Sequence, residues 1–358
     1  MRNQVTDQVL EHSCSGDDPT PSDADVAPRH TGTPVSMQSI NPRHRRAASA
    51  IARGLRQSPV RRSTSLVELK PGGSRPLFFI HDGDGQTLLY LNLAHRLPPA
   101  SDLSIVGIEP LRLQGVPLAH PSVEAMAAYY VTEIRRHQPS GPYLVAGLCA
   151  GGVIAFEIAC QLQRAGESID RLFILDSAVP GTPRRQGVAR QRVGRLMQAL
   201  AGDGSADRSR VARAWTACAV IARKAANTVG WEITNRAARW SIAARFRLLR
   251  FLRARELPWP RFLPELTVRQ IYESADARYD AGRLCDTTVV LVRALAGAGD
   301  DQPYREIYAD DTLGWAAHTD RLTTIDADGG HSSMLQEPWV QPLAAAMAAA
   351  MPPVRSAG

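Results

Sequence analysis

The stretch GLCAGG, residues 147–152, has the form of a tight turn between a strand and a helix, with Cys149 at its centre. The preceding run at 143–146 is apolar and typical of a buried strand, and residues 153–159 repeat apolar side chains at helical spacing. Glycines around a central nucleophile allow the strained turn that exposes the nucleophile above a sheet. The sequence therefore predicts a nucleophile elbow in which the nucleophile is a cysteine.

Strand-like and helix-like segments alternate on both sides of this turn. Runs typical of strands lie at 77–80, 105–108, 172–175, 288–292 and 322–325, and helical patterns at 88–97, 123–137 and 339–351. This order predicts an α/β fold with a mostly parallel sheet flanked by helices. The region at about 183–265 carries Arg- and Ala-rich helical patterns without a strand signal, so we interpret it as an inserted helical lid.

The composition predicts one large folded region behind a polar leader. Of 358 residues, 44% are hydrophobic, which supports a substantial core. Residues 1–65 are rich in Ser, Pro, Asp and Arg and are expected to be disordered or weakly ordered, whereas 66–352 form the α/β domain. No apolar run is long enough to cross a membrane and the N-terminus lacks a signal-peptide core, so we expect a cytoplasmic protein.

Cysteines and charge narrow the function classes. The five cysteines are scattered and odd in number, which favours neither a disulfide framework nor a zinc site. Residues 184–255 contain 17 basic and 3 acidic residues, a local charge of +14, so the rest of the chain carries −7 against the total of +7. This basic segment is either a solvated helical face or a docking surface for an acidic partner. No nucleic-acid-binding motif accompanies it.

A base and an acid follow the nucleophile in the chain order that goes with such an elbow. The helix that starts after Cys149 directs its N-terminal dipole at the thiol, which favours thiolate. His331 follows the last predicted strand and is the candidate base. Asp176 ends the strand after the elbow helix and is the candidate acid, with Asp300 or Asp301 as the alternative.

Two backbone N–H groups are expected to stabilise a developing oxyanion. The first belongs to Ala150, directly after the nucleophile. The second belongs to the loop after the first core strand, at Gly83 or Asp82. His81, at the start of this loop, is interpreted as a residue that orders the loop.

Several motifs together resemble the thioesterase domains of nonribosomal peptide and polyketide synthases, over roughly residues 65 to 350. They are LFFIH at 77–81, the elbow with its AFE continuation, ILDS at 174–177, LGW at 313–315 and GHSSMLQEP at 330–338. The resemblance implies an α/β-hydrolase fold with a helical lid, a Cys149, Asp176 and His331 triad, no cofactor of its own, and substrates held as thioesters on the 4′-phosphopantetheine arm of a carrier protein.

The sequence departs from this family in having Cys149 in place of the usual serine and Asp82-Gly83-Asp84-Gly85 where the family commonly has Pro-Ala-Gly-Gly. A thioester on cysteine conserves the activation of the incoming thioester, so the sequence predicts acyl or aminoacyl transfer in secondary-metabolite biosynthesis. Hydrolytic editing or release is the alternative within this chemistry. A cysteine hydrolase of small esters or lactones, or a non-catalytic carrier-binding module, are the other hypotheses.

The chain contains no carrier or adenylation domain, so we expect the carrier on another protein or synthase module. The sequence leaves the acyl group, the acceptor and the oligomeric state undefined.

Overall fold

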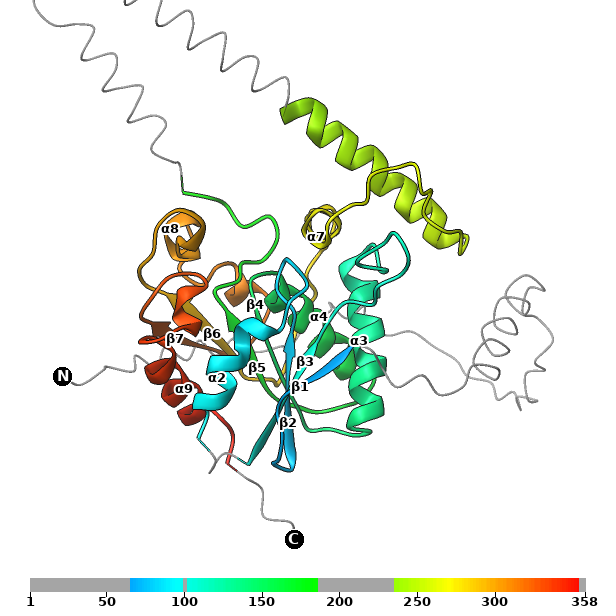
Figure 1. Ribbon diagram of the computed structural model, residues 1–358. Coiled ribbons are helices and arrows are strands. Elements are labelled where there is room, and N and C mark those ends of the chain that lie inside the picture. Colours follow the sequence, from blue (N-terminus) through cyan, green and yellow to red (C-terminus); the bar gives the residue numbers. More distant parts are fainter. Residues whose placement is uncertain (1–64, 99–101, 186–234, 354–358) are drawn as a thin grey trace, which may run out of the picture. The chain divides into compact units, whose positions relative to one another are not determined.

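Within the described residues, seven strands form one sheet in the order β1-β3-β2-β4-β5-β6-β7 (Figure 1). The structure is a computed structural model, and it describes residues 65–98, 102–185 and 235–353. Strands β2 to β7 run parallel to one another, whereas β1 pairs antiparallel with β3 at the edge of the sheet. The strands are β1 Leu66–Lys70, β2 Arg75–Ile80, β3 Leu103–Ile108, β4 Tyr143–Leu148, β5 Ile169–Leu175, β6 Val289–Ala294 and β7 Leu322–Ala327.

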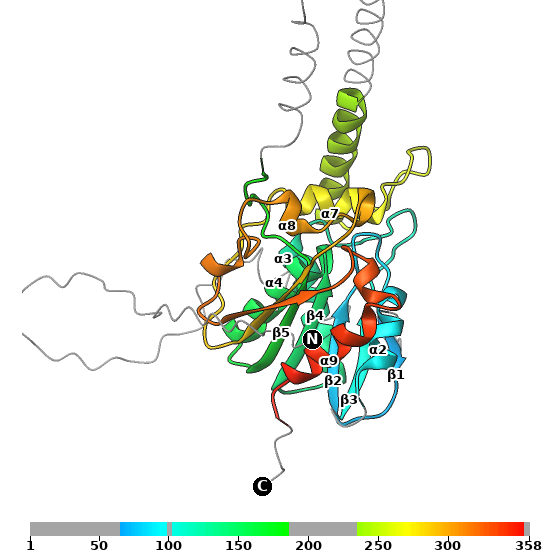
Figure 2. The same cartoon turned by 90° about the vertical axis from the view of Figure 1, so that its left-hand side faces the viewer.

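Helices cover both faces of the sheet, as Figures 1 and 2 show from two sides. One apolar cluster joins α3 and α4 to one face, and a second joins α2 and α9 to the other. Successive side chains of a strand point to opposite faces, so Phe78 belongs to the first cluster while Leu77 and Phe79 belong to the second. The helices are α2 Leu91–Arg96, α3 Val123–His137, α4 Ala150–Arg164, α7 Val268–Asp276, α8 Tyr304–Ile307 and α9 Val340–Ala349, and the short 3-10 turns are η1 Leu88–Tyr90, η3 Gly299–Asp301, η4 Trp315–Ala317 and η5 Ser333–Leu335.

This arrangement is an α/β-hydrolase fold, and it confirms the predicted fold class. The predicted core strands and helices all appear, with ends that differ by a few residues. Strand β1 was not predicted, because it lies at the sheet edge and only Leu69 among its five residues is buried. The leader predicted over 1–65 lies almost wholly outside the described residues, as do residues 186–234 of the lid predicted at about 183–265, so those two predictions stay predictions.

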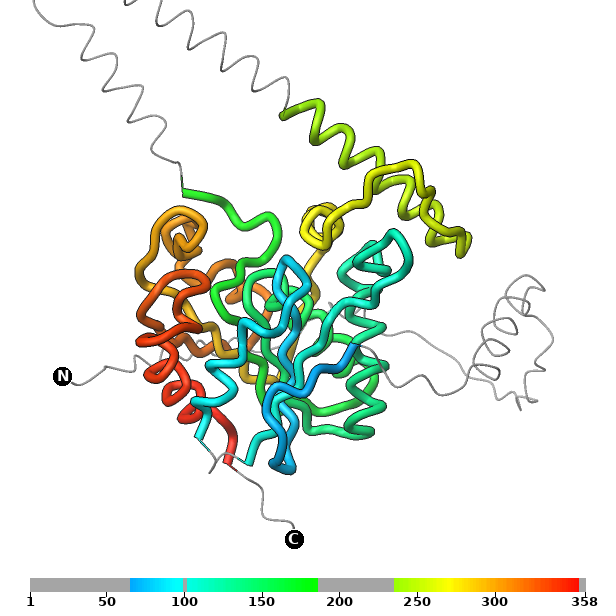
Figure 3. The backbone as a smooth tube through the Cα atoms, in the orientation of Figure 1, coloured from blue at the N-terminus to red at the C-terminus, as the bar shows by residue number. Residues whose placement is uncertain are grey.

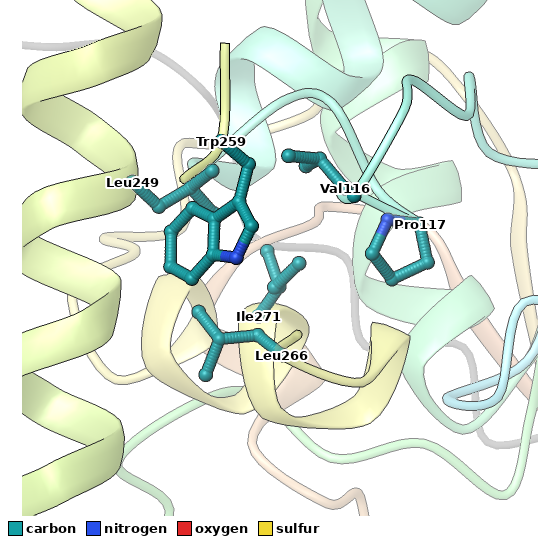
Figure 4. Close-up of a pocket in the computed structure, with 7 residues that line it drawn as sticks. Val116, Pro117, Leu249, Trp259, Leu266 and Ile271 are labelled. Atoms are coloured by element: carbon teal, nitrogen blue, oxygen red, sulfur yellow. The ribbon is translucent and has the colours of Figure 1, made fainter. Parts of the chain in front are cut away.

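The C-terminal part of the inserted segment, the region at about 183–265 that was predicted as a lid, packs onto the core from residue 235 onward. Residues 235–254 are helical and bury Phe246, Leu249 and Leu252 in the same cluster as α3 and α4. Figure 4 shows Leu249 and Trp259 beside Val116 and Ile271 in an apolar seam. Because this seam leaves no room for a water molecule, the end of the insertion is held by close packing.

Helices α7 and α8 both lie at the upper end of the sheet in the two cartoon views, where β2 and β4 end (Figures 1 and 2). The tube in Figure 3 shows the loop after β2 extending from the same end of the sheet toward α7. This carboxyl edge of the parallel strands is where ligands bind in open α/β sheets. Among the described residues, no helix is both long and apolar enough to span a membrane.

Candidate active site

Cys149 lies between β4 and α4 in a strained backbone conformation. Its φ is 54° and its ψ is −120°, a region that residues with a side chain rarely occupy. A Cβ atom at Gly147 would lie 2.2 Å from the backbone of Gly151, and one at Gly151 would lie 2.7 Å from the carbonyl oxygen of His81. The elbow therefore requires glycine at both positions.

Hydrogen bonds join this turn to the strands beside it. The Cys149 N–H donates to the Leu175 carbonyl oxygen of β5 at 3.0 Å. The buried Tyr90 hydroxyl accepts from the Leu148 N–H and donates to the Ile80 carbonyl oxygen, both at 2.8 Å. Cys149 is thus fixed by its strand neighbours as well as by the glycines.

The structure brings Asp176 and His331 together beside Cys149. The His331 Nδ1–H donates to Asp176 Oδ2 at 2.6 Å, which leaves Nε2 for the hydrogen bond with Cys149. Asp176 is fully buried and also accepts the Ala294 N–H at 3.3 Å and the Tyr304 N–H at 3.1 Å. A carboxylate that accepts several hydrogen bonds is held in one orientation, and it fixes the tautomer of the imidazole in turn.

The electrostatic surroundings favour the protonated form of His331. Burial by itself lowers the pKa of this imidazole, but hydrogen bonds to Asp176 and Cys149 and the negative charges of both outweigh burial and raise the pKa from 6.5 to about 10. At neutral pH the imidazole of His331 is therefore protonated, with its Nδ1–H on Asp176.

Asp301, the alternative acid, forms hydrogen bonds with the loop that carries His331 and none with the imidazole ring. Its carboxylate accepts the Ser332 N–H at 2.7 Å and the Ser333 hydroxyl at 2.6 Å, and its carbonyl oxygen accepts the His331 N–H at 2.9 Å. Burial opposes ionisation of Asp301, but these hydrogen bonds lower its pKa to about 2. Asp300 is exposed in η3. Neither aspartate is hydrogen-bonded to the imidazole.

Tyr304 is a site residue that the sequence analysis missed. Its hydroxyl lies 3.2 Å from Cys149 Sγ, and its ring stacks on the His331 ring with 4.5 Å between centroids and an interplanar angle of 14°. Tyr304 begins α8, in a polar stretch after β6 that has no recognisable motif. Only the folded chain brings this residue to the elbow.

The two expected oxyanion donors are neighbours. A Cβ atom at Gly83 would lie 3.9 Å from the Ala150 Cβ, so the loop after β2 passes directly over the start of α4. The Asp82 N–H already donates to the Gln86 carbonyl oxygen. The Gly83 N–H is therefore the candidate for the second oxyanion donor. Ala150 is the first helical residue, whose N–H has no partner within a helix.

Buried His81 orders this loop, as the sequence indicated. Its Nδ1–H donates to the Asp82 carbonyl oxygen at 2.7 Å and its Nε2 accepts from the Tyr130 hydroxyl at 2.8 Å. Burial lowers its pKa to about 4, so the ring is neutral at physiological pH.

The unusual acidic loop has a partner on α7. Arg269 donates to both carboxylate oxygens of Asp84, at 2.9 and 2.6 Å, and Val268 packs against Gly85. This bidentate pair joins α7 to the loop that carries Gly83. The departure from the family pattern at Asp84 is therefore matched by an arginine on α7.

Within residues 65–98, 102–185 and 235–353, no group of three or more His, Cys, Asp or Glu side chains is arranged to hold a metal ion.

A sheet with a nucleophile elbow, and with an aspartate and a histidine joined at its carboxyl edge, defines the α/β-hydrolases. The chain belongs to the thioesterase domain family, whose family model matches residues 75–344. Members of this family are enzymes that hydrolyse or transfer acyl thioesters, and their nucleophile is usually serine.

The relatives are large biosynthetic synthases. Non-reducing polyketide synthase terA of Aspergillus terreus is 38% identical over 107 residues, which cover 30% of this chain and 5% of terA. The N-(5-amino-5-carboxypentanoyl)-L-cysteinyl-D-valine synthase of Amycolatopsis lactamdurans is 39% identical over 137 residues, which cover 37% of this chain and 4% of that synthase. The matches thus span only a small fraction of these relatives' lengths.

Among solved structures, the thioesterase domain of NocB, in covalent complex with a fluorophosphonate nocardicin G analog, matches with a TM-score of 0.48. It is 20% identical, over 80% of this chain and 99% of the NocB domain.

Proposed function

We propose that this protein transfers an acyl or aminoacyl group from a carrier-bound thioester to a second acceptor, through a thioester on Cys149. The observation that carries the proposal is the 2.6 Å pair of His331 and Asp176 beside a cysteine in a nucleophile elbow. In this proposal Cys149 is the nucleophile, His331 moves the proton and Asp176 orients His331.

In the first half-reaction, the Cys149 thiolate attacks the thioester carbonyl carbon and the carbonyl π electrons move to oxygen. The N–H groups of Ala150 and Gly83 are positioned to stabilise that oxyanion. When the intermediate collapses, the bond to the carrier sulfur breaks and the leaving thiolate takes a proton from the His331 imidazolium. The products are acyl-Cys149, neutral His331 and a free carrier thiol.

In the second half-reaction, neutral His331 takes the proton of an acceptor thiol or amine as the acceptor attacks the acyl carbon. The bond to Cys149 Sγ then breaks and its electron pair stays on sulfur. The acceptor leaves acylated, and the resting thiolate and imidazolium are restored. Every proton released in one half-reaction is thus taken up in the other.

Cysteine suits transfer better than hydrolysis because the acyl-enzyme remains a thioester. Its free energy is close to that of the incoming thioester, so the exchange is reversible and a second thiol can accept the group. A thiolate is also a strong nucleophile near neutral pH, with less need of a base than a serine hydroxyl.

The proposed donor is a carrier protein that bears the acyl group on 4′-phosphopantetheine. Carrier proteins are typically acidic, and residues 184–255 of this chain carry a local charge of +14 from 17 basic and 3 acidic residues. Opposite charges of this size accelerate encounter. The synthases that the chain resembles support a place in nonribosomal peptide or polyketide biosynthesis.

Intact-mass spectrometry tests the proposal directly. The protein is incubated with carriers loaded with a panel of acyl and aminoacyl thioesters, beside Cys149→Ala and the matched variant Cys160→Ala. Cys160 lies on the same helix but is 3% exposed, and burial raises its pKa to about 12. We expect the wild type and Cys160→Ala to gain the acyl mass and Cys149→Ala to remain unmodified.

The fate of the adduct separates the alternatives. An adduct that persists in water and is discharged by a second carrier thiol or an amine supports transfer. An adduct lost rapidly to water indicates a hydrolytic thioesterase. If no loaded carrier gives an adduct, the proposal is wrong, and turnover of free esters or stable carrier binding then distinguishes a small-ester hydrolase from a binding module.

A further inference from the structure

Tyr304 contacts all three residues of the Cys149, His331 and Asp176 group. Its hydroxyl lies 3.2 Å from Cys149 Sγ, its ring stacks on His331, and its backbone N–H donates to Asp176 Oδ2 at 3.1 Å. Tyr304 thereby places its hydroxyl at the Cys149 sulfur, while its contacts with His331 and Asp176 fix its own position.

The backbone around Tyr304 holds the hydroxyl at this position. Tyr304 starts α8, and its ring also packs against Tyr308 with 5.4 Å between centroids. The Arg185 N–H donates to the Ile307 carbonyl oxygen at 2.8 Å, and the Ala309 N–H donates to the Pro183 carbonyl oxygen at 2.9 Å. Tyr304 is therefore anchored on one side by the histidine and on the other by the described start of the inserted segment.

The hydroxyl can act only as a donor to an anionic sulfur. Burial, followed by the negative charge of Cys149, raises the pKa of Tyr304 well above its ordinary value, so the phenol keeps its proton at neutral pH. A thiolate carries no proton and can only accept a hydrogen bond. A hydrogen bond to a charged acceptor is stronger than one between neutral groups.

We propose that Tyr304 is a catalytic hydrogen-bond donor that stabilises the Cys149 sulfur as a thiolate, both when it attacks and when it leaves. This inference rests on the proposed function and deepens it. In the second half-reaction the bond between Sγ and the acyl carbon breaks and the electron pair returns to Sγ, where the Tyr304 O–H meets it. The proton of the acceptor goes to His331, and Tyr304 keeps its own.

The consequence is a bias toward transfer. A stabilised thiolate is a better leaving group. When an incoming thiol attacks acyl-Cys149, the tetrahedral intermediate therefore expels the Cys149 sulfur more often than it expels the incoming thiol. Tyr304 would thus accelerate discharge of the acyl group to the acceptor, in addition to activating the nucleophile.

Tyr304→Phe removes the hydroxyl and keeps the ring that stacks on His331. The first readout needs no substrate: the rate of Cys149 alkylation by iodoacetamide as a function of pH, followed by intact mass. We expect the midpoint of the profile to rise by about one pH unit, so that alkylation slows about tenfold at pH values below the wild-type midpoint. Tyr308→Phe, at the residue directly after α8, is expected to retain the wild-type profile.

The second readout is discharge of preformed acyl-Cys149 to an acceptor thiol in a single turnover. Tyr304→Phe is expected to slow this step about tenfold while the KM for the loaded carrier stays unchanged, which a general structural defect would not produce. If Tyr304→Phe does not fold, 3-fluorotyrosine at position 304, a stronger donor, is expected to move the alkylation midpoint to lower pH.

The outcomes separate this inference from the proposed function. If His331→Ala changes the alkylation profile and Tyr304→Phe does not, the role of Tyr304 is overturned while the Cys149 mechanism stands. If neither variant changes the profile and no acyl adduct forms on Cys149, the proposed function itself fails, and this inference fails with it.

Discussion

Gly147 permits the conformation of Cys149 because its α-carbon lies against the first turn of α4. An alanine Cβ there would lie 2.2 Å from the Gly151 backbone, which cannot withdraw without shifting the helix. We expect Gly147→Ala to lower the free energy of unfolding by about 3 kcal/mol, at the upper end of ordinary overpacking. Urea unfolding measures the difference.

Gly83→Ala is the matched control for stability. Its Cβ would meet only the Ala150 Cβ, at the ordinary contact distance of 3.9 Å. The expected change is within about 0.5 kcal/mol. Equal destabilisation by the two substitutions would contradict the steric account of the elbow.

The raised pKa of His331 predicts a pH-dependent contribution to stability. A group whose pKa is higher in the folded state stabilises the fold fully below its unfolded pKa, and this contribution is lost as pH rises through the folded pKa. For His331 the window runs from 6.5 to about 10. We therefore expect the difference in unfolding free energy between the wild type and His331→Gln to shrink across this range.

Urea unfolding of both proteins from pH 6 to pH 11 checks this expectation, because subtraction removes titrations that the two proteins share. A difference that stays constant or grows with pH would mean that the imidazolium is not favoured by Asp176 and Cys149.

At the scale of elements, the sequence predicted the parts that carry strong periodic signals. The inner parallel strands are buried on both faces and read as continuous apolar runs, and α3 begins and ends at the predicted residues 123 and 137. Strand β1 has one buried residue in five and resembles the polar leader before it. Helix α7 had a readable start, the capping box of Thr267 and Gln270, which the sequence analysis overlooked.

The residues of the candidate site likewise divide into those that the sequence predicts and those that it does not. Cys149, Asp176 and His331 could be predicted because each follows a strand end in a fixed chain order. The position of Tyr304 and the hydrogen bonds of Asp301 to the His331 loop could not be predicted, because both depend on how irregular loops return to the elbow. Such contacts leave no periodic pattern in the sequence.

The Asp84 and Arg269 pair couples α7 to the loop that carries Gly83. Both side chains are more than half exposed, so the pair is expected to contribute only about 0.2–1 kcal/mol to stability. Its larger effect should be on acylation, because Arg269 fixes the loop that carries Gly83, the proposed oxyanion donor. We expect Asp84→Arg and Arg269→Asp each to slow Cys149 acylation severalfold, and the double charge swap to restore much of the rate.

The Asp286 and Arg321 pair is a control of similar length and exposure, 2.8 Å across the opposite edge of the sheet. Breaking it should leave acylation unchanged. If both pairs affect the acylation rate equally, Asp84 and Arg269 have no special connection to the site.

At the scale of the whole molecule, the two described ends of the inserted segment both meet the site. Its start contacts α8, which carries Tyr304, through the Arg185 N–H and the Ile307 carbonyl oxygen, and it forms a bridge with Tyr308 directly after α8. Its end packs through the seam of Figure 4 and continues into α7, which carries Arg269. A partner that binds the insertion is therefore positioned to influence both Tyr304 and the Gly83 loop.

The charge distribution predicts how such a partner arrives. The chain carries +7 in total, with +14 between residues 184 and 255 and −7 elsewhere, so the attraction is local to the insertion. We expect kcat/KM for a loaded acidic carrier to fall roughly tenfold between about 0.05 and 0.5 M NaCl, because salt screens the encounter. For a neutral small-molecule thioester of the same acyl group, the change should stay below about twofold.

Charge reversal at either Arg239 or Arg247, on the exposed face of helix 235–254, should lower kcat/KM for the carrier and flatten its salt dependence. Arg321→Glu, at the far edge of the sheet, is the control for total charge and should have little effect. The buried face of the helix, with Phe246 and Leu249, is untouched by these substitutions, so the fold should persist. Equal salt dependence for carrier and small thioester would instead mean that the arginines form only a solvated face and take no part in recognising the donor.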